Sequence, residues 1–126
     1  MTDEEIKSYN AIIVDEAQFA TREEVDFLTY IVDELGVPVI CYGLRTDFQN
    51  NLFSGSERLF AVADVIEEIK TICWCGLAAK CNARYNKNGI VREGAQVMLG
   101  ANDSYIALCR KHYKEGNFGP NWMENL

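Results

Sequence analysis

The segment Ile12-Ile13-Val14-Asp15-Glu16-Ala17-Gln18-Phe19 decides the fold of this chain. Its β-branched beginning is typical of a buried strand in an α/β sheet, and the strand ends in two adjacent carboxylates. In a nucleotide-binding sheet, one such carboxylate supports phosphate-bound Mg²⁺ and the next lies beside the reacting atom. The alternative is that Asp15 and Glu16 only cap the end of the strand.

The residues that follow extend this strand into an α/β unit. Thr21 begins a helix with an acidic first turn, apolar residues recur at helical spacing, and Gly36 ends the helix. The apolar run 37–42 predicts a second strand, so that strand, helix and strand form a right-handed parallel crossover. The long loop 43–55 then lies at the carboxyl end of a strand, where open α/β sheets bind ligands.

Later segments give weaker patterns. Residues 57–63 are expected to form a short helix, and residues 64–69 a further strand that continues to Ile72. Two alternating runs, 79–85 and 96–99, together with the turn 86–89, predict a hairpin-like subdomain. We expect a helix or a turn over 103–113.

Composition narrows the function classes. At 126 residues and 48% hydrophobic composition, the chain can bury one ordinary core. Residues 1–35 hold ten Asp and Glu residues against Lys7 and Arg22, a balance of −8, while the rest of the chain carries +1. An acidic chain argues against general nucleic-acid binding, and its apolar runs are too short to span a bilayer. We expect a cytoplasmic protein that binds neither nucleic acid nor membrane.

Five cysteines and one histidine suggest a metal site rather than disulfides. Cys73 with Cys75, and Cys109 with His112, form two short ligand pairs that suit tetrahedral Zn²⁺. Four protein ligands would leave no position for an activated water, so the zinc would be structural. Simple burial of the thiols is the alternative, and Cys81 is a possible substitute ligand for Cys73.

Five blocks in order resemble the carboxyl-terminal two-thirds of the thymidine kinases that carry a zinc-bound lasso domain. These blocks, which lie within residues 11–113, are IIVDEAQF, GLRTDFQNNLF, TICWCG, VMLGANDSY and CRKHY. The resemblance implies an α/β fold: a partial P-loop-kinase-like parallel sheet over 1–72 and a zinc-binding lasso subdomain with a tail over 73–126.

The resemblance also implies a reaction, the transfer of the γ-phosphoryl group of ATP to the 5′-hydroxyl of thymidine. Asp15 would support Mg²⁺, and Glu16 would accept the proton of the hydroxyl. Zn²⁺ would be structural, and the family is commonly tetrameric, which implies a homo-oligomer.

The family's nucleoside site maps onto two groups of residues. Leu44, Phe48 and Phe53, together with Phe19, would wall an apolar slot for the flat pyrimidine. In the lasso, Tyr105 would close over the nucleoside, and Met98 and Asn82 would face the base. The lasso backbone, including that of Gly100, would form hydrogen bonds with the base.

One family feature is missing from the beginning of the sequence. A Walker A loop is expected before the first strand, but residues 1–10 contain no glycine. ATP with Mg²⁺ would therefore bind only if an amino-terminal half were supplied, and we expect the isolated chain to be inactive. The rival interpretation is a non-catalytic, zinc-containing interaction module. A zinc-ribbon nucleic-acid binder is disfavoured by the acidic charge.

Overall fold

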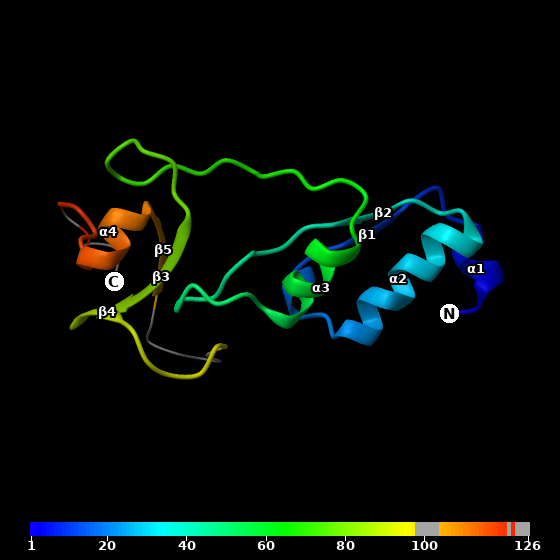
Figure 1. The fold of residues 1–126 in the computed structure, drawn as a ribbon, viewed down its shortest axis with the longest axis horizontal. Helices are drawn as coiled ribbons and strands as arrows, with labels where there is room; N and C mark the ends of the chain where they lie inside the picture. The colour runs from blue at the N-terminus through cyan, green and yellow to red at the C-terminus, as the bar shows by residue number, and fades with distance from the viewer. Residues whose placement is uncertain (98–103, 121, 123–126) are drawn as a thin grey trace. The chain divides into compact units, whose positions relative to one another are not determined.

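The structure, a computed structural model, describes residues 1–97, 104–120 and 122. It divides into two compact units. Figure 1 labels the helices and strands and colours the chain by residue number. The first comprises Met1–Arg45 and Leu52–Ile66, and the second comprises Thr46–Asn51 and Glu67–Leu126. The α/β class is confirmed, with a parallel pair of strands in the first unit and an antiparallel sheet in the second.

The first unit is built on the strand–helix–strand segment that the sequence predicts. Strand β1 (Ile12–Val14) pairs in parallel with β2 (Val39–Cys41), and helix α2 (Arg22–Leu35) connects them. Parallel neighbours need such a crossover because the end of the first strand and the start of the second lie at opposite edges of the sheet. Both strands therefore end at one edge, which carries the residues after Val14 and after Cys41.

Local sequence fixes both ends of α2. The Thr21 hydroxyl accepts a hydrogen bond from the Glu24 backbone N–H at 3.1 Å, and the Glu24 carboxylate accepts one from the Thr21 N–H at 2.9 Å. This capping box satisfies two N–H groups that a helix start leaves unpaired. At the other end, Gly36 adopts a left-handed conformation with φ of +70°, which glycine reaches without steric cost.

A short amino-terminal helix closes one end of this unit. Helix α1 (Asp3–Lys7) buries Ile6 in a cluster with Ile31 of α2 and Val37. The Tyr30 hydroxyl donates to the Asp3 carboxylate at 2.7 Å.

Helix α3 (Ser54–Val62) packs on the turn that follows β1. The short helix expected over 57–63 is confirmed and begins three residues earlier. Gly55 lies so close to this turn that an added Cβ would be 2.5 Å from the Ala17 carbonyl oxygen and 2.7 Å from that of Gln18. Only a residue without a side chain fits this contact.

The expected strand over 64–69 is wrong. These residues form neither helix nor strand, and Ile72 makes only an isolated bridge with Ala78. The side chains of Val65, Ile66 and Ile69 are 76%, 57% and 74% exposed. The apolar run stays exposed because no described strand pairs with it, and Glu67 and Glu68 interrupt it.

The second unit contains a three-stranded antiparallel sheet in the order β4-β3-β5. Strand β3 (Cys81–Asn86) is central, between β4 (Gly89–Val91) and β5 (Ser104–Leu108), and helix α4 (Arg110–Glu115) follows. The hairpin turn over 86–89 is confirmed.

Two expectations for this region are wrong. The second hairpin strand begins directly after the turn, at Gly89, and not over 96–99; of that run, residues 98 and 99 lie outside the described residues. Residues 104–108 form a strand rather than part of a helix or turn. They do so because the whole of β5 pairs with β3, from Cys81↔Leu108 to Tyr85↔Ser104.

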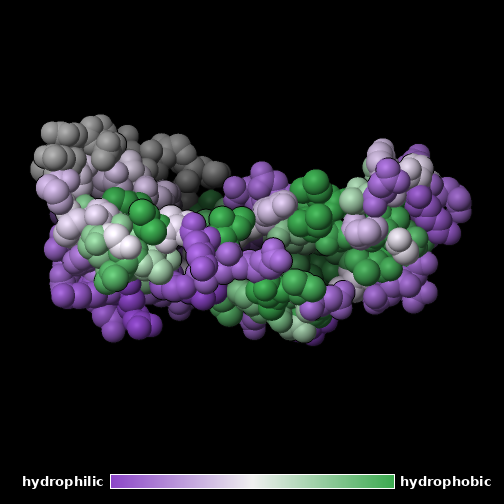
Figure 2. All heavy atoms as spheres, turned by 90° about the horizontal axis from the view of Figure 1, so that it is seen from above, coloured by the Kyte–Doolittle hydropathy of each residue, from purple (hydrophilic) through white to green (hydrophobic). Residues whose placement is uncertain are grey.

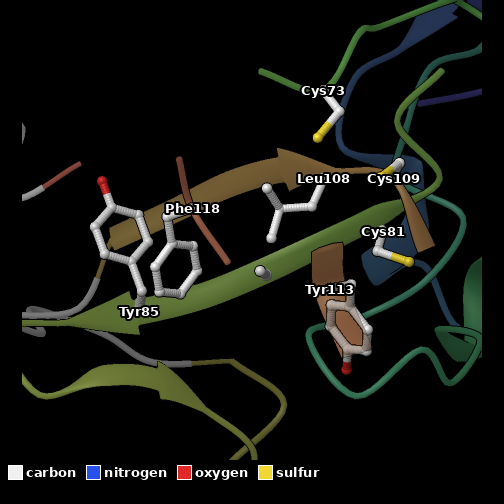
Figure 3. Close-up of a cluster of buried hydrophobic side chains, with 8 residues drawn as sticks. Cys73, Cys81, Tyr85, Leu108, Cys109, Tyr113 and Phe118 are labelled. Carbon is white, nitrogen blue, oxygen red and sulfur yellow. The ribbon is translucent and has the colours of Figure 1, made fainter. Parts of the chain in front are cut away.

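One face of this sheet carries the core of the second unit (Figure 3). The buried side chains come from β3, β5, α4 and the segments on either side: Cys73, Cys81, Ala83, Tyr85, Leu108, Cys109, Tyr113 and Phe118.

Residues Thr46–Asn51, part of the loop after β2, belong to this unit and bind it through polar contacts. The Tyr113 hydroxyl donates to the Phe48 carbonyl at 2.5 Å, and Gln49 Nε2 donates to the Arg92 carbonyl at 2.8 Å. The loop after β2 is therefore anchored to residues more than 40 positions later in the chain.

Hydrophobic patches lie among hydrophilic ones on the surface that Figure 2 shows. In the parallel pair, Ile13 and Ile40 are neighbours in register and are 67% and 46% exposed. Within the described residues, no helix has the length and apolar character needed to cross a membrane.

The contact at Gly55 gives a first prediction. Gly55→Ala should lower the free energy of unfolding by about 3 kcal/mol, because its Cβ would be forced against backbone carbonyls that cannot move aside. Gly36→Ala is the matched control. It meets nothing within 4 Å and should cost only about 1 kcal/mol for its left-handed backbone.

Urea denaturation, followed by circular dichroism, measures both variants. Equal destabilisation by the two substitutions would contradict the packing assigned to α3.

Candidate nucleoside and metal sites

The two predicted carboxylates lie at the carboxyl edge of the parallel pair. Asp15 follows β1 directly, and its Oδ1 accepts the Glu16 backbone N–H at 2.9 Å. Glu16 has a φ of +53°, a left-handed conformation that is uncommon for a residue with a side chain. Both side chains are exposed. Their carboxylates are therefore available to a ligand at this edge.

Gln18, which the sequence analysis did not identify, links the segment after β1 to the segment after β2. Its side chain is 1% exposed; Nε2 donates to Glu16 Oε2 at 2.5 Å, and Oε1 accepts the Leu44 backbone N–H at 3.1 Å. One buried amide thus orients a carboxylate after β1 and holds the segment after β2. The sequence does carry a signal for this role: Gln18 is a polar residue between Ala17 and Phe19, directly after the two carboxylates.

Three of the predicted pocket residues belong to the first unit. The rings of Phe19 and Phe53 meet edge to face, with centroids 5.6 Å apart and planes at 85°. Phe53 is buried, whereas Phe19 and Leu44 are half exposed. The structure therefore brings Phe19 and Phe53 together and leaves apolar surface on Phe19 and Leu44.

The other predicted pocket residues belong to the second unit. Phe48 is buried, Asn82 is partly exposed on β3, and Tyr105 on β5 is 45% exposed. Met98 and Gly100 lie outside the described residues.

Arg84 of β3, also missed by the sequence analysis, contacts two of these residues. Its guanidinium carbon lies 3.7 Å from the centre of the Phe48 ring, and its Nε donates to the Tyr105 hydroxyl at 2.8 Å. The available signal was a charged residue inside an otherwise buried strand.

The four predicted metal ligands converge. The donor atoms of Cys73, Cys75, Cys109 and His112 all lie within 4.8 Å of one another. The two cysteines that precede β3 meet the cysteine and the histidine that follow β5. Residues up to 39 positions apart in the chain thus form one cluster.

The distances in this cluster fit a tetrahedral zinc ion. Metal–sulfur bonds of about 2.3 Å and metal–nitrogen bonds of about 2.0 Å give tetrahedron edges of about 3.8 Å between sulfurs and about 3.5 Å between sulfur and nitrogen. The Cys75 and Cys109 sulfurs are 3.9 Å apart, and His112 Nδ1 lies 3.6 Å from Cys73 Sγ and 3.5 Å from Cys109 Sγ. These three distances match the expected edges, and all four donor atoms lie within 4.8 Å of one another.

The surroundings of the cluster favour a thiolate at Cys73. Burial of Cys73 opposes ionisation, but the backbone N–H groups of Cys75 and Cys109 and the His112 ring outweigh burial and lower the pKa of the Cys73 thiol to about 6. At Cys75 the Leu77 backbone N–H favours the thiolate. Desolvation and the neighbouring sulfurs nevertheless raise its pKa overall. Crowded sulfurs of this kind ionise together only when a cation lies between them.

Trp74 supports the histidine of the cluster. Its ring stacks on His112, with centroids 4.5 Å apart and planes at 18°, and its Nε1 donates to the Asn117 carbonyl at 3.0 Å. Such outer contacts fix the orientation of a ligating ring.

The remaining cysteines lie outside the cluster. The sulfur of Cys81 accepts a hydrogen bond from Asn50 Nδ2 at 3.4 Å, and Cys41 is part of β2 in the first unit. Of the described residues, only Cys73, Cys75, Cys109 and His112 form a group that could hold a metal ion.

Comparison with known proteins adds the family. The sequence model of thymidine kinase matches residues 1–113. A thymidine kinase of Pasteurella multocida is 56% identical over 107 residues, which cover 84% of this chain and 56% of that protein. Thymidine kinases of Legionella pneumophila strain Paris and Haemophilus influenzae are 51% and 53% identical over 94% and 84% of this chain, and the matches cover 57% and 55% of those proteins.

The chain thus spans about half the length of the curated relatives that it matches. A family match over residues 1–113 covers most of the 126 residues, including the carboxylate edge and the metal cluster. The chain belongs to the thymidine kinase family.

Proposed function

We propose that this chain contributes the nucleoside side and the catalytic carboxylates of a thymidine kinase. The reaction is transfer of the γ-phosphoryl group of ATP to the 5′-hydroxyl of thymidine. One observation carries the proposal: within a chain of this family, Asp15 and Glu16 lie exposed at the carboxyl end of a parallel strand. Ligands of open α/β sheets bind at this end.

The proposed roles of the carboxylates follow from the chemistry of phosphoryl transfer. The transition state needs charge neutralisation by Mg²⁺ and a positioned group that accepts the proton of the hydroxyl. Asp15 supports the metal ion and Glu16 accepts the proton. Gln18 restricts the Glu16 carboxylate through its buried amide, so that the base is oriented before substrate arrives.

The triphosphate requires a cradle that these residues do not provide. The 126 residues contain no Gly-x-x-x-x-Gly-Lys-Ser/Thr sequence. We propose that ATP and its Mg²⁺ bind when a segment with this motif is supplied from outside the 126 residues. Chemistry would then depend on that segment, whereas nucleoside binding would depend on this chain.

The residues that the family resemblance assigns to thymidine are kept as proposed contacts. In the first unit these are Phe19, Leu44 and Phe53, which would offer apolar surface to the pyrimidine. In the second unit they are Phe48, Asn82, Met98, Gly100 and Tyr105, with Tyr105 proposed to lie over the nucleoside.

The metal cluster is proposed to hold one structural Zn²⁺. Three thiolates and one imidazole complete a tetrahedron, so no coordination position is left for substrate or water. The lasso that the family resemblance implies would need fixed supports on both sides in order to position its hydrogen-bonding groups. Zinc would join the segment before β3 to the segment after β5.

Assembly and location are also proposals. We propose a homo-oligomer in the cytoplasm, and the exposed Ile13 and Ile40 side chains are compatible with burial in a larger assembly.

Thymidine binding tests the nucleoside site. Calorimetric titration of thymidine into the zinc-loaded chain should give saturable binding, and Tyr105→Ala should weaken it at least about tenfold because a large aromatic contact is lost. Tyr9→Ala, which removes an exposed tyrosine of the first unit, is the matched control and should leave the affinity unchanged. Failure of the unaltered chain to bind would favour a non-catalytic zinc-containing module.

Metal content tests the ligand set. Cys73→Ser and Cys109→Ser should each lose the zinc, measured by atomic emission, from about one ion per chain to a small fraction. Cys81→Ser should keep the metal, since Cys81 lies outside the cluster. Zinc loss in Cys81→Ser together with retention in Cys73→Ser would reverse the assignment.

Turnover tests the base. When a Walker A segment from a relative restores phosphorylation, Glu16→Gln should lower kcat by about 10²–10⁴-fold with little change in thymidine affinity. Glu57→Gln on α3 serves as the control for loss of one carboxylate. Full activity in Glu16→Gln would remove the proposed base.

A further inference from the structure

Arg84 is buried although it carries a permanent charge. It occupies the central strand β3 with 1% of its surface exposed. Among the described residues, no carboxylate lies within ion-pair distance of its guanidinium. Burying a charge is costly unless specific contacts offset it. The contacts of this side chain therefore indicate why it is placed there.

These contacts join three segments of the second unit. The guanidinium covers the Phe48 ring at 3.7 Å, Nε donates to the Tyr105 hydroxyl at 2.8 Å, and a terminal nitrogen donates to the Gln96 carbonyl at 3.0 Å. Arg84 and Tyr105 are direct cross-strand partners of β3 and β5, so the bond spans the shortest path between the strands.

A buried carboxylate lies at the other end of this network. Asp47 is 3% exposed and accepts backbone N–H groups of Gln49 at 2.8 Å and Asn51 at 3.0 Å. Its second oxygen accepts the Gln96 side-chain amide at 2.9 Å. Gln96 thus bridges the buried anion and the buried cation, one through its side chain and the other through its carbonyl.

The bond from Arg84 determines what the Tyr105 hydroxyl can do. Arginine only donates hydrogen bonds, so the phenol oxygen is the acceptor and its own hydrogen remains to be donated. Among the described residues, the Tyr105 hydroxyl donates no hydrogen bond. Tyr105 is nevertheless 45% exposed. The Tyr105 side chain is thus partly open to a ligand, while its hydroxyl is held next to a buried cation.

We propose that Arg84 is a positioning residue for nucleoside binding. Its guanidinium fixes the Tyr105 phenol as a hydrogen-bond donor to an acceptor oxygen of the bound nucleoside, while it holds the Phe48 ring. This inference rests on the proposed function, since it deepens the role given to Tyr105. Arg84 does not touch the nucleoside and acts through Tyr105.

A double-mutant cycle in the zinc-loaded chain tests the proposal, with thymidine affinity measured by calorimetry. Tyr105→Phe removes only the hydroxyl, and Arg84→Met removes the cation while keeping an apolar stem. Each should weaken thymidine binding about tenfold, the loss expected for one charge-assisted hydrogen bond. The double variant should bind no more weakly than Arg84→Met, because both changes break the same interaction.

Arg92→Met is the matched control. Arg92 belongs to the same unit, lies over the Tyr113 ring at 4.7 Å and donates to the carbonyls of Tyr113 and Lys114. The Arg92 side chain makes these contacts with no residue proposed to bind thymidine. Its replacement should therefore leave the thymidine affinity within twofold of that of the unaltered chain. Unchanged zinc content verifies the fold of each variant, and Arg84→Gln, which also removes the cation, replaces Arg84→Met in the cycle if the latter loses zinc.

The outcomes separate this inference from the proposed function. Full affinity in Tyr105→Phe, or additive losses in the double variant, would overturn the role of Arg84 while leaving thymidine binding intact. Absence of thymidine binding in the unaltered chain, seen before any variant is made, would overturn the proposed function and this inference with it.

Discussion

The convergence of four soft donor atoms is the constraint on which the second unit depends. The Cys75 and Cys109 sulfurs lie 3.9 Å apart and would repel one another as thiolates, and a cation at the centre of the cluster would turn this repulsion into attraction. The cluster connects the chain before β3 with the chain after β5, the two segments between which the sheet lies. Leu108, Tyr113 and Phe118 pack in the same buried cluster as Cys73 and Cys109.

In the first unit, apolar packing and one buried amide orient the residues at the carboxyl edge of the two strands. Parallel pairing of β1 with β2 brings two chain segments to one edge, but backbone pairing does not orient side chains beyond the strands. Gln18 does so, because a fully buried amide must satisfy both of its polar ends. Its partners are the Glu16 carboxylate and the Leu44 backbone. The close approach of α3 at Gly55 places the helix directly against the backbone of the turn that contains Gln18.

Buried charge in the second unit is organised around Gln96. Asp47 and Arg84 have opposite charges, and the amide and carbonyl of one residue satisfy both. Such a network favours one set of hydrogen bonds strongly. Any other set would leave a buried charge without a hydrogen-bond partner in a low-dielectric interior. In this way the loop Thr46–Asn51 is held against a sheet whose strands come much later in the sequence.

Local chemistry in the sequence determined much of this protein. The capping box of α2, the apolar strands on either side of it, the turn after β3 and the four metal ligands all depend on neighbouring residues or on ligand spacing. Apolar content alone could not predict whether residues 64–69 or 104–108 form a strand, because a strand needs a partner: β3 pairs with the second run, and no described strand pairs with the first. The contacts of Gln18, Asp47 and Arg84 were equally out of reach. Each joins residues brought together only by folding, and the free energy that fixes them comes from satisfying buried polar groups, which tertiary structure alone decides.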